Sequence, residues 1–165
     1  MLYKDILNGV FDARMKQIIE HTNDLINYYI NNFDITPERL CLTNNVKVLD
    51  IENENLNILC FLSYRDSYII TIVNNAKRDF YIYREFVMSI IDEYVRQFIT
   101  VDNKILDSSI IDSVTKYGKN NSRLDKYLNG MANVLLEKDI ATNNKKEIKN
   151  KNKRFIKIIN EWCED

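Results

Sequence analysis

The sequence predicts an α+β domain: a long helix, then a small antiparallel sheet, then a cluster of helices. Two observations predict this class. Apolar residues recur every three or four positions before Pro37 and again after about residue 83, which is the helical period. Between these blocks lie short runs rich in Val, Ile, Leu and Tyr, separated by Asn, Asp and Glu, as in strands and their turns. No internal repeat or linker divides the 165 residues, so residues 1–165 are expected to form a single globular domain.

The first segment predicts one long helix with a broad apolar face. Its stripe consists of Leu7, Phe11, Met15, Ile18, Leu25, Tyr29 and Phe33, with Thr22 as the polar exception. A face of this width needs to be covered, so the helix is expected to pack on the core.

The middle segment predicts an antiparallel meander of four or five strands. The short connections Asn44-Asn45, Glu52 to Asn55 and Arg65-Asp66 favour pairing between consecutive strands. The third strand has apolar residues on both faces and is expected at the centre of the sheet. "DFYIY" is either a fifth strand or the first turn of the next helix, because five residues are too few to distinguish the periods. The strands are expected at about 39–43, 46–51, 56–64 and 67–73, with 79–83 as the ambiguous segment.

Three or four helices are expected in the remainder. Asp102 is a plausible N-cap for the second of them and Gly118 a plausible end, while Ser122 with Asp125 resembles a capping box for the third. A basic helix is expected at about 144–162. The stripes are Tyr83, Val87, Ile90, Tyr94, Phe98 and Val101, then Leu106, Ile110, Val114 and Tyr117, then Leu124, Leu128, Met131 and Leu135.

The cysteines and the N-terminal sequence predict a cytoplasmic protein, in the host cytoplasm if the source is a virus. Cys41, Cys60 and Cys163 are odd in number and far apart, as expected of free thiols in a reducing compartment. Lys4 and Asp5 interrupt the apolar core that a signal peptide needs, and no apolar run is long enough for a membrane span. Abundant Ile, Asn, Lys and Tyr are typical of an AT-rich genome, so lysines and tyrosines carry little weight as functional evidence.

Few residues are suited to catalysis, and we expect neither an enzyme nor a cofactor. His21 is the single histidine, and although it could pair with Cys41 or a serine across the fold, a lone histidine more often has a structural role. The 3 glycines cannot build a phosphate-binding loop, and the scattered cysteines do not suit structural zinc.

A carboxylate metal site is a third alternative. Asp50, Glu52 and Asp66 lie near the ends of predicted strands, where a magnesium nuclease could hold its ions. The Asp/Glu-x-Lys triplet of such nucleases occurs only at 102–104 and 147–149, outside the predicted strands. We therefore expect these carboxylates to be solvated turn residues.

The clearest feature is the concentration of charge in residues 143–157. Seven basic side chains and one carboxylate give this segment a charge of +6, which leaves −7 for the rest of the chain. In a helix, Lys146, Lys149, Lys153 and Lys157 share one face, with Arg154 nearby. Three interpretations stay open: a solvated face, a contact with an acidic protein, or a contact with nucleic acid.

A second candidate surface is the Tyr64-Arg65-Asp66 hairpin with Tyr68. Tyrosine and arginine are frequent interface anchors, although both tyrosines could be ordinary sheet residues.

Together these patterns favour a non-enzymatic protein that binds another protein with an acidic surface, of the inhibitor, immunity or adaptor type. Such a protein would block or bridge its partner. The alternative is a nucleic-acid-associated protein that docks through the basic helix. The candidate partner-binding residues are Lys146, Lys149, Lys153, Arg154, Lys157, Tyr64, Arg65 and Tyr68.

Overall fold

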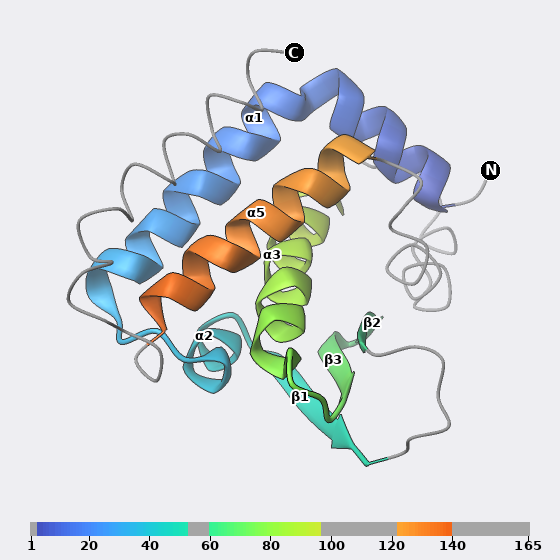
Figure 1. The fold of residues 1–165 in the computed structure, drawn as a ribbon. Coiled ribbons are helices and arrows are strands. Elements are labelled where there is room, and N and C mark those ends of the chain that lie inside the picture. Colours follow the sequence, from blue (N-terminus) through green and yellow to red (C-terminus); the bar gives the residue numbers. More distant parts are fainter. Residues whose placement is uncertain (1–2, 53–59, 97–121, 140–165) are drawn as a thin grey trace.

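The computed structural model describes residues 3–52, 60–96 and 122–139, which form an α+β fold. The described elements are four helices, α1 (Tyr3–Asn32), α2 (Pro37–Thr43), α3 (Arg78–Arg96) and α5 (Ser122–Lys138), and three strands, β1 (Val46–Ile51), β2 (Cys60–Arg65) and β3 (Ser67–Val73). Helix α3 lies between the sheet and the pair α1 and α5, and α2 packs at the start of β1 (Figure 1). The predicted fold class is therefore confirmed.

Helix α1 matches the predicted long N-terminal helix in part, because it ends at Asn32, and Phe33, the last residue of the predicted stripe, lies beyond it and is 39% exposed. It contains one irregularity, because Arg14 has a non-helical backbone (φ −122°, ψ 22°). Beyond this kink, Ile18, Ile19 and Ile26 are fully buried against the rest of the core.

Helix α2 replaces the strand predicted at about 39–43, and that prediction is wrong. Thr36 caps the helix by accepting a hydrogen bond from the backbone N–H of Arg39 at 3.2 Å, and Pro37 occupies the first turn, where its missing N–H costs nothing. The strand was predicted because Leu40 and Leu42 belong to the short apolar runs that follow Pro37. In the helix, Leu40 is buried and Leu42 is exposed.

The sheet is mixed, and the predicted antiparallel meander is wrong. Its order is β1-β3-β2, with β1 parallel to β3 and β2 antiparallel to β3. β3, rather than the predicted third strand, is therefore central. Ile51 pairs with Val73 and Cys60 with Ile72, so the end of β1 and the start of β2 lie at the same end of the sheet, two strand spacings apart, roughly 10 Å.

Two turns depend on residues that tolerate a left-handed backbone. Asn45 (φ 55°) joins α2 to β1, and Asp66 (φ 63°) is the one residue between β2 and β3. Both lie where the sequence predicts turns.

Helix α3 is the centre of the core, and it includes residues 79–83, which resolves the ambiguity of that segment. Within α3, Glu93 is the one exposed residue, because the sheet covers one side and α1 and α5 cover the other. Such burial on all sides explains why Ile82, Phe86 and Ile91, which lie off the predicted stripe, are also apolar.

Helix α5 confirms the stripe predicted after Ser122. Tyr127 donates a hydrogen bond to Asn23 of α1 at 2.5 Å, which joins the two outer helices. The first part of the predicted third strand, the predicted helix between Asp102 and Gly118, and the basic helix at 144–162 lie outside the described residues.

Candidate functional site

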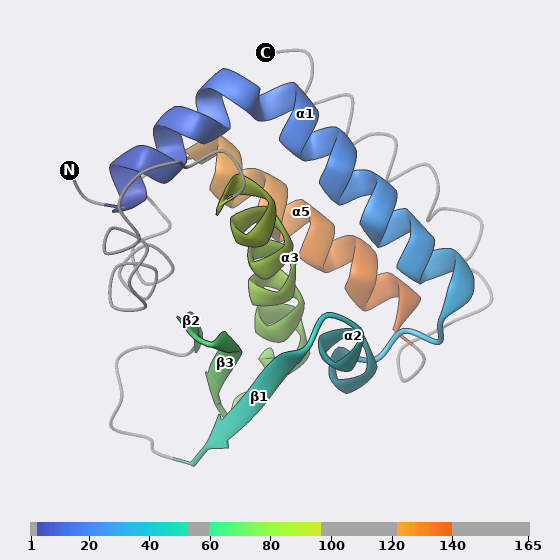
Figure 2. The same ribbon diagram turned by 180° about the vertical axis from the view of Figure 1, so that it is seen from behind.

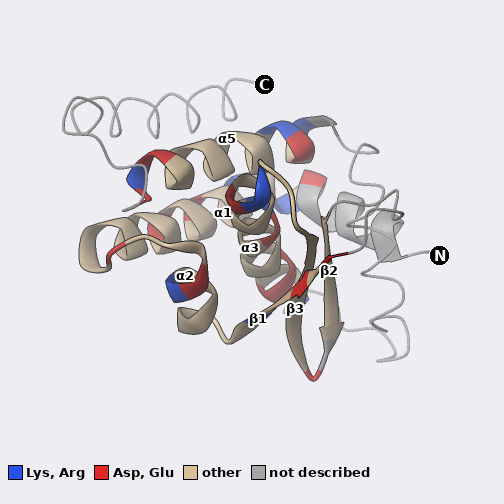
Figure 3. Cartoon of the chain, turned by 60° about the horizontal axis from the view of Figure 1, so that its bottom comes forward, with Lys and Arg blue, Asp and Glu red and all other residues tan. Residues whose placement is uncertain are grey.

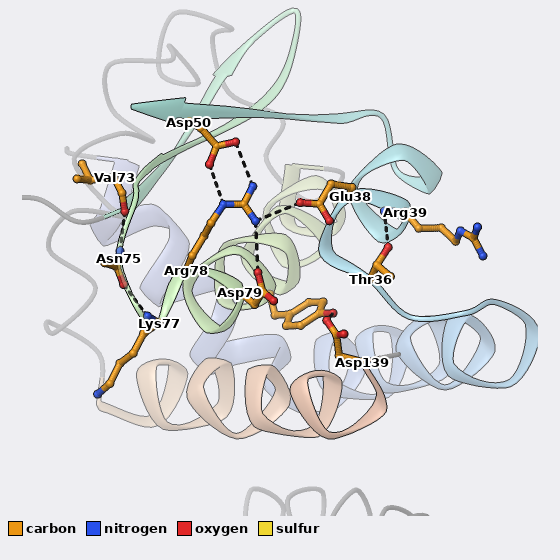
Figure 4. A network of polar contacts seen from close by, with 11 residues as sticks. Thr36, Glu38, Arg39, Asp50, Val73, Asn75, Lys77, Arg78, Asp79 and Asp139 are labelled. Atoms are coloured by element: carbon orange, nitrogen blue, oxygen red, sulfur yellow. Dashed lines mark hydrogen bonds and ion pairs between the residues drawn. The ribbon is translucent and has the colours of Figure 1, made fainter. Parts of the chain in front are cut away.

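The start of α3 holds a cluster of charged residues around Arg78, the first residue of the helix (Figure 4). Arg78 binds Asp50 of β1 with two hydrogen bonds, Nε to Oδ1 at 2.7 Å and Nη2 to Oδ2 at 3.0 Å. Its Nη1 donates to Glu38 of α2 at 3.1 Å and to Asp79 at 3.3 Å. One guanidinium therefore joins α2, β1 and α3.

Local turn geometry positions this arginine. Asn75 Oδ1 accepts a hydrogen bond from the backbone N–H of Lys77 at 2.8 Å, and Asn75 Nδ2 donates to the Val73 carbonyl at 2.6 Å. Asn75 thus fixes the turn between β3 and α3. This turn sets the position of Arg78 at the start of the helix.

The charges of the cluster compensate one another. The hydrogen bonds from Arg78 lower the pKa of Asp50. Burial, and then the nearby Asp139, raise the pKa of Asp79, and the hydroxyl of Tyr83 donates a hydrogen bond to Asp139. The charged side chains that could bind a substrate instead bind each other. We therefore describe this cluster as the Arg78 junction, because it holds α2, β1 and α3 together.

A pocket of about 700 Å³ opens beside the junction, between residues 75–81 at the start of α3 and Asn133 and Leu136 of α5. Its charged lining residues are Lys77, Arg78 and Asp79. Since both signs are present and Arg78 is already paired, the pocket does not favour a ligand of one charge.

The structure does not bring the three candidate metal ligands together. Asp50 pairs with Ile72 of β3, whereas Asp66 directly precedes Ser67. Five positions of β3 separate these points, roughly 17 Å. Glu52 is exposed beyond the end of β1. Within residues 3–52, 60–96 and 122–139, no group of three His, Cys, Asp or Glu side chains could hold a metal ion.

His21 and the described cysteines are also apart. His21 stacks on Tyr94 near the end of α3, with ring centroids 4.0 Å apart. Cys41 is buried in α2, and desolvation raises its pKa to about 12, which disfavours the reactive thiolate. Burial also raises the pKa of Cys60. Cys163 lies outside the described residues.

The predicted tyrosine surface is largely internal. Tyr68 is 6% exposed, and its hydroxyl donates a 2.5 Å hydrogen bond to the buried Asp92, so it offers no anchor to a partner. Tyr64 is partly buried, with the guanidinium of Arg96 4.3 Å from its ring centroid. These two tyrosines are sheet residues that face α3. The backbone of Arg65 pairs with that of Ser67 at the hairpin. The structure does not describe the side chain of Arg65.

The basic candidates Lys146, Lys149, Lys153, Arg154 and Lys157 all lie outside the described residues. On α2 and α5, basic and acidic residues are interspersed (Figure 3). The concentrated charge of this chain therefore remains a feature of its sequence between 143 and 157.

One surface that the sequence did not predict is the border strand β1 (Figure 2). Val46 and Val48 face α3 and contact the core, whereas Lys47, Leu49 and Ile51 face the opposite side. Leu49 is 53% exposed, and Leu42, at the end of the preceding helix, is 79% exposed. We call the unpaired side of β1 together with Lys47, Leu49 and Ile51 the β1 edge.

The described helices contain no segment long and apolar enough to cross a membrane. Comparison with models of protein families, with curated proteins and with solved structures gives no match, so the case for a function depends on the surfaces described above.

Proposed function

We propose that this protein acts by binding another protein, as an inhibitor, immunity protein or adaptor that blocks or bridges its partner. The observation that carries the proposal is the exposure of two large aliphatic side chains, Leu42 and Leu49, on adjacent elements at the border of the sheet. A single exposed leucine is common on protein surfaces, but exposed leucines together with an unpaired strand edge offer a partner both apolar contacts and backbone hydrogen bonds.

The chemistry of the described part supports binding over catalysis. The carboxylates at the start of α3 surround an arginine, His21 stacks on a tyrosine, and the described thiols have raised pKa values. None of these groups has the nucleophile and base arrangement that would point to a reaction.

The test is capture of a partner by the purified full chain from a nuclease-treated lysate of the source cells. Wild type is expected to retain one stoichiometric protein. The double variant Leu42→Asp/Leu49→Asp is expected to lose at least tenfold in affinity, as for substitutions at the centre of an interface.

The matched control is Tyr28→Asp on α1, because Tyr28 is 54% exposed and α1 packs on α3 away from the strands. This variant should bind like wild type, and circular dichroism should show that all variants are folded. Absence of a stoichiometric partner, or equal binding by the double variant, would contradict the proposal.

A second candidate function, nucleic-acid binding through residues 143–157, is favoured by the +6 charge of that segment. Lys149→Glu/Lys153→Glu is expected to weaken binding to a random-sequence duplex. It should also reduce the slope of log K against log salt by roughly 2. The control Lys16→Glu/Lys126→Glu makes the same charge change at two exposed lysines of α1 and α5. Equal effects of both variants would indicate non-specific attraction and would count against a site.

A further inference from the structure

We propose that the partner binds by adding an extended segment as a fourth strand along the unpaired side of β1. This inference rests on the proposed function and names the geometry of the contact and the chemistry of the bound segment.

The backbone of β1 has hydrogen-bonding groups that point away from the sheet. The Ile51 carbonyl accepts a hydrogen bond from the N–H of Asn74, directly after β3, at 3.1 Å. Backbone groups alternate in direction along a strand, so Lys47, Leu49 and Ile51 direct theirs toward β3 and Val48 and Asp50 direct theirs outward. In the described part of the chain, no strand pairs with β1 on that side. An extended backbone is the structure that matches such a row of donors and acceptors.

β1 is the more accessible of the two border strands. Lys47, Leu49 and Asp50 are exposed, whereas Leu62 and Ser63 at the middle of β2 are buried. A segment that approached β1 would therefore meet backbone that water already reaches.

The side chains of the β1 edge indicate what the segment carries. An added strand alternates its side chains as β1 does, so apolar residues would lie beside Leu49 and Ile51 and a carboxylate beside Lys47. A second copy of β1 fits less well. On the side that Lys47 faces, the strand carries only Lys47, Leu49 and Ile51, so a paired copy would offer that lysine no carboxylate. The occupant is thus a segment of a different protein, with alternating apolar residues and an acidic residue.

The decisive variant is Val48→Pro. Proline removes the outward N–H of Val48 and places a ring where the added strand would lie, but it removes no hydrogen bond to β3. Its matched control is Val48→Ala, which shortens the same side chain and keeps the N–H. Circular dichroism and thermal unfolding show whether both variants are folded.

The probe is the protein captured by wild type, titrated against each variant by calorimetry. Val48→Pro is expected to bind at least tenfold more weakly than Val48→Ala. Lys47→Glu should weaken binding about two- to fivefold, while Lys47→Arg should preserve it. Equal affinities for the proline and alanine variants would overturn strand addition yet leave the proposed function standing, whereas absence of any captured partner would remove both.

Two further measurements keep the inference testable if Val48→Pro does not fold. In wild type, the amides of Val48 and Asp50 should exchange with solvent rapidly in the free protein and slowly in the complex; unchanged exchange would contradict the proposal. Sedimentation of the free chain tests the other occupant. A dimer that Lys47→Glu or Val48→Pro dissociates would show that a second copy occupies the edge, and the proposal would be wrong.

Discussion

Glu85 shows how the environment of one residue sets its chemistry. It lies in α3 and is 3% exposed. Its Oε1 accepts a hydrogen bond from Arg84 Nη1 at 2.9 Å, while its Oε2 has no partner within the described residues. Arg84 also binds Asp125 and Asn129 of α5, so it is shared among several acceptors. Burial outweighs this attraction and raises the pKa of Glu85 to about 7.

This raised pKa predicts a pH-dependent stability. Between about pH 4.5 and 7 the folded state binds a proton at Glu85 that the unfolded state has lost, so the free energy of unfolding decreases as the pH rises through this window. Asp92, whose pKa burial raises to about 6, acts in the same direction at somewhat lower pH. Glu85→Gln should therefore flatten the pH profile, by up to about 3 kcal/mol between its ends.

The check is urea unfolding from pH 4.5 to 8. The control Glu20→Gln removes the charge of an exposed glutamate of α1, and its profile should be as steep as that of wild type. A Glu85→Gln profile as steep as that of wild type would show that Glu85 ionises normally.

The sequence could not have predicted the burial of Glu85 or that of Tyr68. Glu85 follows Arg84 in an ordinary helical pattern, and it becomes buried only because the sheet and α5 cover opposite sides of α3. Burial of a polar residue is a property of the tertiary packing, which local periodicity does not contain.

At the scale of elements, the helix start signal at Thr36 and Pro37 agrees with the structure, whereas the strand predicted from the short apolar run after it does not. Thr36, Pro37 and Glu38 form an ordinary helix start, yet the short apolar runs after Pro37 were interpreted as strands. The long stripes predicted better: the stripe of α5 is buried throughout and the described part of the α3 stripe is buried or half-buried, whereas Phe33 of the first stripe lies beyond α1 and is exposed.

The Arg78 junction predicts a measurable coupling between elements. In a double-mutant cycle of Arg78→Met and Asp50→Asn, the interaction energy should be about 1 kcal/mol, because the pair is bidentate and the arginine is mostly buried. The pair Arg39–Asp34 is the control. It makes a single contact at 3.2 Å between two exposed side chains, so Arg39→Met and Asp34→Asn should be additive within error.

The measurement is chemical denaturation at neutral pH, where Asp50 is ionised. Coupling of the Arg78 pair that is no larger than that of the Arg39 pair would show that the junction does not stabilise the fold. The sequence placed Asp50 at the end of a strand, but the approach of Arg78 depends on the parallel pairing of β1 with β3, which was not predicted.

At the scale of the whole molecule, the sequence predicted the class of the fold and the places of β1 and β3, but not the order of the strands. Strand order depends on pairing between distant residues, and the short connection predicted at Glu52 to Asn55 favoured direct pairing of two strands that β3 in fact separates. The candidate site likewise depends on pairing between residues that are distant in the sequence. The β1 edge was not foreseen because a border strand is defined by its neighbours and not by its own sequence.

The strand order also has a consequence for how the chain folds. β2 and β3 are joined by Asp66 alone, so they can pair as a local hairpin, whereas Val46 of β1 pairs with Tyr68, 22 positions later in the chain. Closing the longer loop costs more entropy, which favours late arrival of β1 at a hairpin that has already formed. We therefore expect the surface proposed to receive a partner to assemble after the hairpin, so that a chain folded only as far as the hairpin would not present it.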